Sequence, residues 1–272
     1  MSEATTSGAV AGGTRAPAFT TSKIGQTLLW SLVSAAVFLL VWWIASIFSN
    51  PYFLPSPWET AKAIWTLTVN GVLPYSIGIS YFRILSGWII GAAVAVPAAL
   101  FAGRIPILRH LLEPLFNFFR FIPPIAFLGI AILWFGIGEE SKVALIIYTS
   151  LFTVFISTMA GVTALDMSPE RAALCLGASR SQVLWRVILP ATVPTIVVGM
   201  RIGMGFSFMS VVAAEMIAAQ EGVGFLIYNA RLLFKTANAF AGIITLGAMG
   251  LLADYAFRRL VKAVFHKHSL PF

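Results

Sequence analysis

The sequence predicts an all-α transmembrane protein with six membrane-spanning helices. Of its 272 residues, 59% are apolar and 10% are charged, and the mean hydropathy is +0.90. Soluble domains carry about 25% charged residues. A hydrocarbon core about 30 Å thick needs about 20 apolar residues per helix, and uncharged runs of that order recur here. The six predicted spans cover residues 27–48, 84–102, 121–138, 143–165, 202–214 and 237–253.

The basic residues predict the orientation of these spans. Lys and Arg are enriched in short cytoplasmic segments of membrane proteins. With a cytoplasmic N-terminus, eleven basic residues fall inside and five outside, which predicts two cytoplasmic termini and places Glu139 and Glu140 outside. The asymmetry also explains the net charge of +8, so lipid and not nucleic acid is the expected partner. The inside set is Arg15, Lys23, Arg104, Arg109, Arg171, Arg180, Arg186, Arg258, Arg259, Lys262 and Lys267; the outside set is Lys62, Arg83, Lys142, Arg231 and Lys235.

Composition divides the chain into three segments. Residues 1–22 are rich in Ser, Thr, Gly and Ala and are typical of a flexible cytoplasmic tail. Residues 23–262 form the predicted transmembrane domain, and residues 263–272 form a cytoplasmic C-terminal tail. Cys175 is the only cysteine, which excludes an intrachain disulfide and a multi-cysteine metal site. We therefore expect no metal site.

A short helix is predicted between the first two spans. Ser56 is a favourable N-cap, Pro57 suits the first helical position, and Glu59 stands three residues after the cap, as in a capping box. The apolar residues that follow, together with Lys62, are typical of a helix lying at the outer membrane interface. Its expected role is anchoring.

Proline and glycine interrupt the later spans. Segment 103–120 predicts an inner turn that leads into the third span. Pro123 and Pro124 follow, and their rings interrupt the regular hydrogen bonding of a helix. Segment 219–236 contains two glycines and an asparagine, which predict an outer loop that dips back toward the membrane.

A charged insert, residues 166–190, lies between two apolar runs. Ser168 is a favourable N-cap and Pro169 fits the first helical position. Gly177 then suits the left-handed conformation that closes a helix. These three residues predict one short helix.

A second helix is predicted within the same insert. Ser179 and Gln182 have the spacing of a capping box, and Pro190 marks the expected end. The insert is therefore predicted to be a helix-turn-helix, and the orientation given above places it in the cytoplasm.

The spacing within the insert resembles a known motif. Arg171-Ala172-Ala173, Gly177, Val187 and Leu189-Pro190 match the E-A-A-x3-G-x9-I-x-L-P loop of permease subunits in binding-protein-dependent ATP-binding-cassette (ABC) importers. Arg171 stands where the motif has Glu, with Glu170 one place early, and Val187 replaces Ile. Further stretches resemble the nitrate, sulfonate and taurine branch: FLPSPWE at 53–59, RFIPPIAFL at 120–128, LWFGIGEESK at 133–142, and residues 199–215. Residues 128–129 and 152–154 lack the prolines expected of that branch. This difference bears on the identity of the substrate and not on the family.

The resemblance implies a six-helix type I ABC importer permease fold with a cytoplasmic coupling helix-turn-helix. It implies a bacterial inner-membrane half-transporter that pairs with a second copy of itself, two ATPase subunits, and a periplasmic or lipid-anchored binding protein. The chain contains no G-x-x-x-x-G-K-[ST] loop, so it is not expected to be an enzyme or to hold a cofactor, and the partner ATPase would bind ATP and Mg. Ala173 and Gly177 are predicted to set the fit to the ATPase. The full set of predicted coupling residues is Glu170, Arg171, Ala172, Ala173, Gly177, Ala178, Ser179, Leu189 and Pro190.

A second set of residues is a candidate for the substrate path. An arginine within a span costs about 2.5 to 3.5 kcal/mol on insertion scales, so something must offset Arg120. An anionic substrate, a position at the interface, or a pair with Glu113 would each do so. Arg201 is expected to contact the insert or a neighbouring helix, and Glu215 is either a gate or dimer contact or an ordinary interfacial residue. The candidates are Arg120, Phe121, Pro123, Pro124, Arg201 and Glu215.

The resemblance indicates candidate substrates, and the sequence disfavours two rival function classes. Taurine or another sulfonate is the first candidate by resemblance, followed by nitrate or bicarbonate and then by an aromatic or pyrimidine compound. A secondary transporter or channel usually needs carboxylates near the midplane, and a membrane enzyme needs clustered His, Asp, Glu or Cys. Neither pattern occurs in the sequence.

Overall fold

The computed structural model describes residues 21–264, and within that range every regular element is helical. The predicted tails, 1–22 and 263–272, lie almost entirely outside the described residues. The elements are α1 (Thr21–Phe48), α2 (Pro57–Val69), α3 (Val72–Arg104), α4 (Pro106–Phe119), α5 (Pro124–Phe135), α6 (Glu139–Thr163), α7 (Ser168–Cys175), α8 (Arg180–Val183), the π-helix η1 (Leu184–Ile188), α9 (Leu189–Ala218), α10 (Val223–Leu232) and α11 (Thr236–Val264).

Five helices are long and apolar enough to cross a membrane. They correspond to α1, α3, α6, the continuous run from α8 to α9, and α11. The sixth predicted span is a pair of shorter helices, α4 and α5, bent by 99°. The all-α prediction is therefore confirmed, and six spans result if the bent pair counts as one. The third span begins earlier than the run predicted at 121–138, because α4 starts at Pro106, and its bend lies at the predicted interruption by Pro123 and Pro124.

The chain forms two units, and α1 belongs to the first of them, which ends at Ser49. Considered by itself, α1 is 28 residues long and uncharged from Leu29 to Phe48. None of the residues in that stretch is buried within the structure of the chain. Its length and composition are those of a membrane span.

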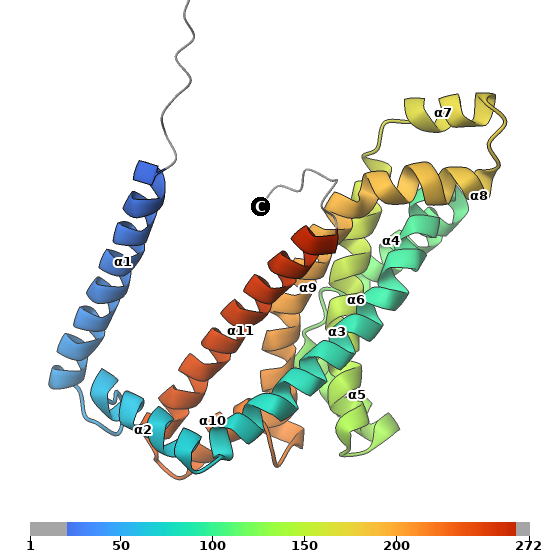
Figure 1. The fold of residues 1–272 in the computed structure, drawn as a ribbon. Helices are drawn as coiled ribbons and strands as arrows, with labels where there is room; N and C mark the ends of the chain where they lie inside the picture. Colours follow the sequence, from blue (N-terminus) through green and yellow to red (C-terminus); the bar gives the residue numbers. More distant parts are fainter. Residues whose placement is uncertain (1–20, 265–272) are drawn as a thin grey trace, which may run out of the picture. The chain divides into compact units, whose positions relative to one another are not determined.

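The second unit begins at Asn50 and contains α2 to α11. Its centre is formed by α3, α6 and α9, which pack along one another, and α11 lies beside α9 (Figure 1). Gly87 of α3 allows the close approach of α6, since a Cβ there would lie 2.6 Å from Ile146. Helices in a membrane gain association energy from such close packing. Gly87 therefore serves the packing of α3 against α6.

The predicted helix near residue 56 is confirmed as α2. The Ser56 hydroxyl accepts a hydrogen bond from the Glu59 amide, and the Glu59 carboxylate accepts one from the Ser56 amide. Trp58 and Trp65 of this helix are exposed, as an interfacial helix requires. By contrast, much of the predicted loop at 219–236 is the helix α10.

The prediction that Pro190 ends a short second helix is wrong. Residues 180–218 form one continuous helical run of 39 residues, so the insert is a single short helix followed by the start of a transmembrane helix. Pro190 lacks an amide hydrogen, and its ring would clash with the carbonyl four residues earlier in a regular helix. The π-turn of η1, where the Leu189 amide donates to the Leu184 carbonyl, lies immediately before Pro190 and relaxes this conflict.

The second unit has two distinct ends. Helix α7 lies at the end where α3 finishes and α8 starts, whereas α2 and α10 lie at the opposite end (Figure 1). The charged insert and the candidate residue Glu215 are therefore at opposite ends of the same bundle.

Candidate functional sites

Helix α7 is bounded by local chemistry that partly matches the prediction. Its N-cap is Met167, one residue earlier than predicted, and Ser168 is not the cap. Instead, the Ser168 amide and hydroxyl donate to the Asp166 carboxylate at 3.0 and 2.9 Å. These bonds favour the charged form and lower the pKa of Asp166. Asp166 therefore orders the entry to α7, a role that Ser168 was predicted to fill.

The predicted end of α7 is confirmed. Gly177 has a φ of +84°, a conformation that a side chain penalises by roughly 1 to 2 kcal/mol. The Gly177 amide donates to Leu174 at 3.0 Å, and the Ala178 amide donates to the Ala173 carbonyl at 3.0 Å. This is the Schellman arrangement of a helix end. The Ser179 capping box is also confirmed, because the Ser179 and Gln182 amides bond to each other's side chains.

One face of α7 packs against the rest of the permease. Glu170 forms an ion pair of 2.8 Å with Arg104 at the end of α3. Ala173 and Ala178 pack on an apolar cluster of Leu100, Val162, Val183 and Ile188. Ala173 is half-buried by this packing, so only part of its surface stays open to the contact with the ATPase that was predicted for it.

The opposite face of α7 is exposed. Arg171 and Ala172 are exposed, and so are Cys175 and Leu176 beyond them. Leu176 is 88% exposed. We call these four residues the exposed face of α7. They combine a small residue, an apolar residue and a cation, which suits contact with another protein.

A buried ion network lies at the other end of the bundle. Glu215 of α9 is fully buried and accepts hydrogen bonds from Arg83 at 2.7 Å, from Ser80 at 2.8 Å and from the Gly224 amide at 2.8 Å. Arg83 of α3 also binds Glu139 of α6 through two bonds of 2.5 and 2.6 Å. The network therefore joins α3, α6, α9 and the start of α10.

The charges of this network balance. Lys142 adds a bond of 2.8 Å to Glu139, so two cations face two carboxylates. Arg83 and Lys142 were predicted as residues of outer segments, but both lie in helices and are buried. The interpretation of Glu215 as an ordinary interfacial residue is also wrong. Arg83, Lys142 and Glu215 are buried, whereas the Glu139 side chain is 49% exposed. The three buried charges are tolerated because the folded chain supplies opposite ones.

The sequence carried a weak signal for this network. Its four charged residues sit at the ends of predicted spans and sum to zero charge. The glycines of the predicted outer loop have a matching reason, because a Cβ at Gly222 would collide with the Glu215 carboxylate. The pairing itself was not visible, since Arg83 and Glu215 are 132 positions apart.

One cavity with an arginine in its wall lies at the bend between α4 and α5. It has a volume of about 300 Å³ and is lined by Arg120, Ile122, Pro124, Tyr148, Thr149, Phe152, Thr153, Ile156, Ser157 and Phe206. We call it the Arg120 cavity. The Tyr148 hydroxyl donates to the Phe119 carbonyl at 2.6 Å and holds the break against α6. Phe121 and Pro123, which were also predicted for the path, are not among the lining residues.

Arg120 has no acidic partner among the described residues. Its guanidinium lies 4.8 Å from the centre of the Phe121 ring. The alternative of a pair with Glu113 is wrong, because Glu113 instead binds Arg109 one turn earlier at 3.1 Å. Within residues 21–264, no carboxylate therefore neutralises the charge of Arg120.

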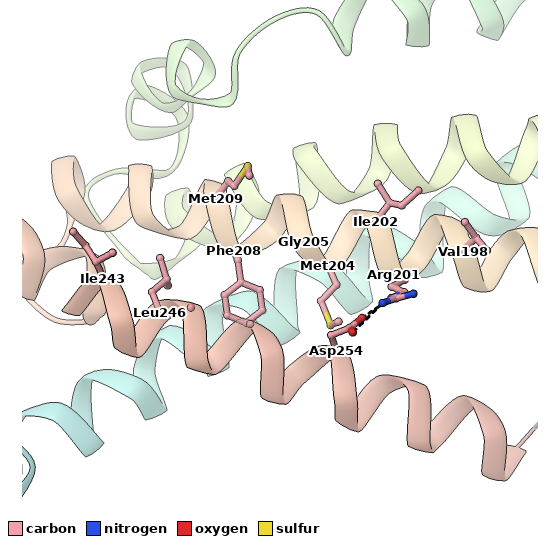
Figure 2. A pocket seen from close by; sticks show the side chains of 12 residues that line it. Val198, Arg201, Ile202, Met204, Gly205, Phe208, Met209, Ile243, Leu246 and Asp254 are labelled. Carbon is pink, nitrogen blue, oxygen red and sulfur yellow. Dashed lines mark hydrogen bonds and ion pairs between the residues drawn. The ribbon is translucent and has the colours of Figure 1, made fainter. Parts of the chain in front are cut away.

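A second and larger cavity, of about 720 Å³, lies between α9 and α11 and contains Arg201 (Figure 2). Arg201 forms two bonds of 2.5 and 3.0 Å with Asp254 of α11, and Asp254 also binds Arg258 at 3.1 Å. The predicted contact of Arg201 with a neighbouring helix is confirmed. Figure 2 shows apolar side chains such as Phe208 and Leu246 around the rest of this cavity.

The structure does not gather the predicted path residues into one site. Arg120 and Pro124 line the cavity at the α4–α5 break, and Arg201 lines the cavity between α9 and α11. Glu215 lies in the buried ion network. These are three separate places, and only the first presents a cation without a carboxylate partner among residues 21–264.

Known proteins resemble this chain along most of its length. Residues 95–266 match the family described as binding-protein-dependent transport system inner membrane component. The taurine transport system permease protein of Escherichia coli is 35% identical over 247 residues, which is 88% of this chain and 90% of that protein. The putative aliphatic sulfonates transport permease protein of Escherichia coli is 32% identical over 87% of this chain and 86% of its own length.

Two further comparisons bear on substrate and fold. The nitrate import permease protein of Synechocystis is 31% identical over 82% of this chain and 84% of its own length. A chain of the MetNI methionine ABC transporter in an inward-facing conformation superposes with a TM-score of 0.58 and 19% identity. That match covers 79% of this chain and 99% of the other, and it supports the likeness in fold.

Proposed function

We propose that this chain, which belongs to the family of binding-protein-dependent transport system inner membrane components, forms the translocation path for a small anionic solute. Within that family it is an ABC importer permease of the taurine, sulfonate and nitrate branch. Taurine or another sulfonate is therefore the first candidate solute. The likeness to the taurine permease carries this proposal, because it extends over 88% of the chain. Nitrate or bicarbonate is the second candidate, supported by the likeness to the nitrate permease.

The proposed complex contains two copies of this chain, two ATPase subunits, and a periplasmic or lipid-anchored binding protein. ATP hydrolysis belongs to the separate ATPase subunit, and this chain is the transport subunit. The exposed face of α7 is the proposed contact for the ATPase, because it joins small, apolar and cationic side chains at one end of the bundle. Glu170, Ala173, Ala178 and Ser179 hold α7 in place, and Leu189 and Pro190 are the first residues of α9 within the continuous helical run 180–218.

Reconstitution tests the proposed function. We expect proteoliposomes that contain the permease and its ATPase to import labelled taurine only when ATP and the binding protein are both present. Excess methanesulfonate should compete for import, whereas excess nitrate should not. Competition by nitrate or bicarbonate alone would assign the transporter to the second candidate. Import of neither class would contradict the proposal for an anionic solute.

The proposed location is the bacterial inner membrane, with both termini and α7 on the cytoplasmic side. The structure supports a labelling test, because Glu140 is exposed at the start of α6, at the opposite end from α7. In a Cys175→Ser background, a cysteine introduced by Glu140→Cys should react with an impermeant thiol reagent in intact cells. In cells that express the permease without its ATPase, which would otherwise cover this face, Cys175 of α7 in the unaltered chain should react only after permeabilisation. The reverse pattern would invert the proposed orientation.

A further inference from the structure

We propose that the Arg120 cavity is a solute-binding site within the permease, in which Arg120 and Ser157 bind the negatively charged group of the transported anion. This inference rests on the proposed function, because it concerns a permease for a small anionic solute. It goes further because it names the residues that contact the solute, and because it assigns this role to Arg120 and not to Arg201.

The first argument is the charge of the cavity. A guanidinium within a membrane-spanning segment is costly unless it is paired or hydrated. Arg120 lies between α4 and α5, and no carboxylate pairs with it in the described part of the chain. Its charge is therefore available to a ligand in the cavity. Arg120 is exposed in the described chain, so its guanidinium is accessible to an anion that enters the cavity and attracts it with the strength typical of pairs near a protein surface.

The second argument is the contrast with Arg201. The cavity between α9 and α11 is more than twice as large, but its guanidinium is bound by both oxygens of Asp254. The Nε and Nη2 donors of Arg201 are therefore already bound to a carboxylate that Arg201 shares with Arg258, and that carboxylate repels an anion that approaches Arg201. The larger cavity is therefore the less suitable one for an anionic solute, despite its size.

The third argument concerns hydrogen-bond donors. In the cavity wall, the Tyr148 hydroxyl donates to the Phe119 carbonyl, and Thr153 donates to the Thr149 carbonyl at 2.9 Å. Thr149 shares its hydroxyl contact with Ser210 at 2.7 Å. Ser157 also lines the cavity, and within residues 21–264 its hydroxyl proton is not committed to another group. Arg120 and Ser157 are thus the donors that a ligand can use.

The fourth argument is the shape of the site. Helix α5 begins at Pro124, which lines the cavity, so the N-terminal end of a 12-residue helix lies at the same wall as Arg120. Phe152, Ile156 and Phe206 supply apolar walls. A volume of about 300 Å³ is at the lower end for ligand pockets. The site therefore fits a small anion with a short apolar part, such as an alkyl sulfonate.

A charge-selective labelling experiment tests this site without depending on import. In the complete transporter in nanodiscs, Cys175→Ser removes the natural thiol and Thr153→Cys places a single thiol in the cavity wall. The rate of modification is measured with an anionic sulfonatoethyl thiosulfonate and with a cationic trimethylammonioethyl thiosulfonate. We expect Arg120→Gln to lower the ratio of anionic to cationic rates by roughly tenfold, because a cation beside the thiol attracts one reagent and repels the other.

Three control variants sharpen this result. Arg120→Lys should preserve the ratio, because it keeps the charge. Arg259→Gln should also preserve it, since Arg259 is exposed on α11, contacts the Tyr255 hydroxyl and lies outside the cavity. Ser157→Ala should leave the ratio unchanged but weaken the protection of the thiol by methanesulfonate. Protection by methanesulfonate with Arg120 present, and its loss in Arg120→Gln, is the expected signature of a site.

The outcomes separate the site from the proposed function. An unchanged rate ratio in Arg120→Gln, or no protection by methanesulfonate with Arg120 present, overturns the site even if sulfonate import is observed. Protection that depends on Arg120, in a transporter that imports no sulfonate or other anion, supports the site and rejects the proposed substrate class.

Discussion

Ala172→Trp is expected to abolish ATP-driven import while the permease still folds and inserts. Ala172 lies on the exposed face of α7, whereas Ala173 packs against the chain's own apolar cluster. A tryptophan at 172 therefore adds bulk where the ATPase is proposed to dock, without disturbing the packing of the bundle. Losses of about 2 kcal/mol or more are common at the centre of an interface, which corresponds to roughly thirtyfold in affinity.

The measurement is co-purification of the ATPase with tagged permease, together with ATP-dependent import. Ala61→Trp is the matched control, because Ala61 is an exposed alanine on α2 at the opposite end of the bundle. It should keep the ATPase and import solute normally. Full retention of the ATPase and normal import by Ala172→Trp would reject α7 as the docking helix.

Gly177 gives a second variant that acts on the same helix by another route. No atom lies within 4 Å of a Cβ added there, so its substitution acts through the positive φ and not through a clash. Gly177→Val should misdirect the end of α7 and reduce import. Gly177→Asn should preserve much of it, because asparagine tolerates the left-handed conformation. Equal import by the two variants would show that the turn geometry does not matter for coupling.

Arg83→Met is expected to cost the permease much of its stability. The change leaves the buried Glu215 carboxylate with only Ser80 and the Gly224 amide as partners. Removal of one partner of a buried ion pair typically costs about 3 to 5 kcal/mol. We therefore expect a large fall in the midpoint of thermal unfolding of the purified transporter in detergent.

Two further variants identify the cause of this loss. Arg109→Met removes an exposed pair one helical turn apart, and such pairs contribute only about 0.3 to 0.5 kcal/mol. It should leave the unfolding midpoint nearly unchanged. Arg83→Met combined with Glu215→Gln removes the uncompensated charge and should recover part of the loss. Equal midpoints for Arg83→Met and Arg109→Met would contradict a structural role for the network.

Local features of this protein were predictable from the sequence. The capping boxes at Ser56 and Ser179, and the positive φ of Gly177, follow from residues within a few positions of each other. The helical class followed from apolar runs that a bilayer selects by length. Even the break near Pro123 was visible, because proline disrupts a helix through its own ring. These properties depend on short-range chemistry, so the chain order alone contains them.

The tertiary structure decided what the local pattern left open. Arg201 acquired a carboxylate from α11 while Arg120 did not, although both are arginines in or near apolar runs. Ala172 and Ala173 are adjacent, yet only Ala173 faces the chain's own core. Glu215 found its partner Arg83 at a distance of 132 positions along the sequence. Whether a charged residue in a membrane protein can bind a ligand or forms a structural ion pair depends on which helix packs beside it. That is a property of the folded bundle.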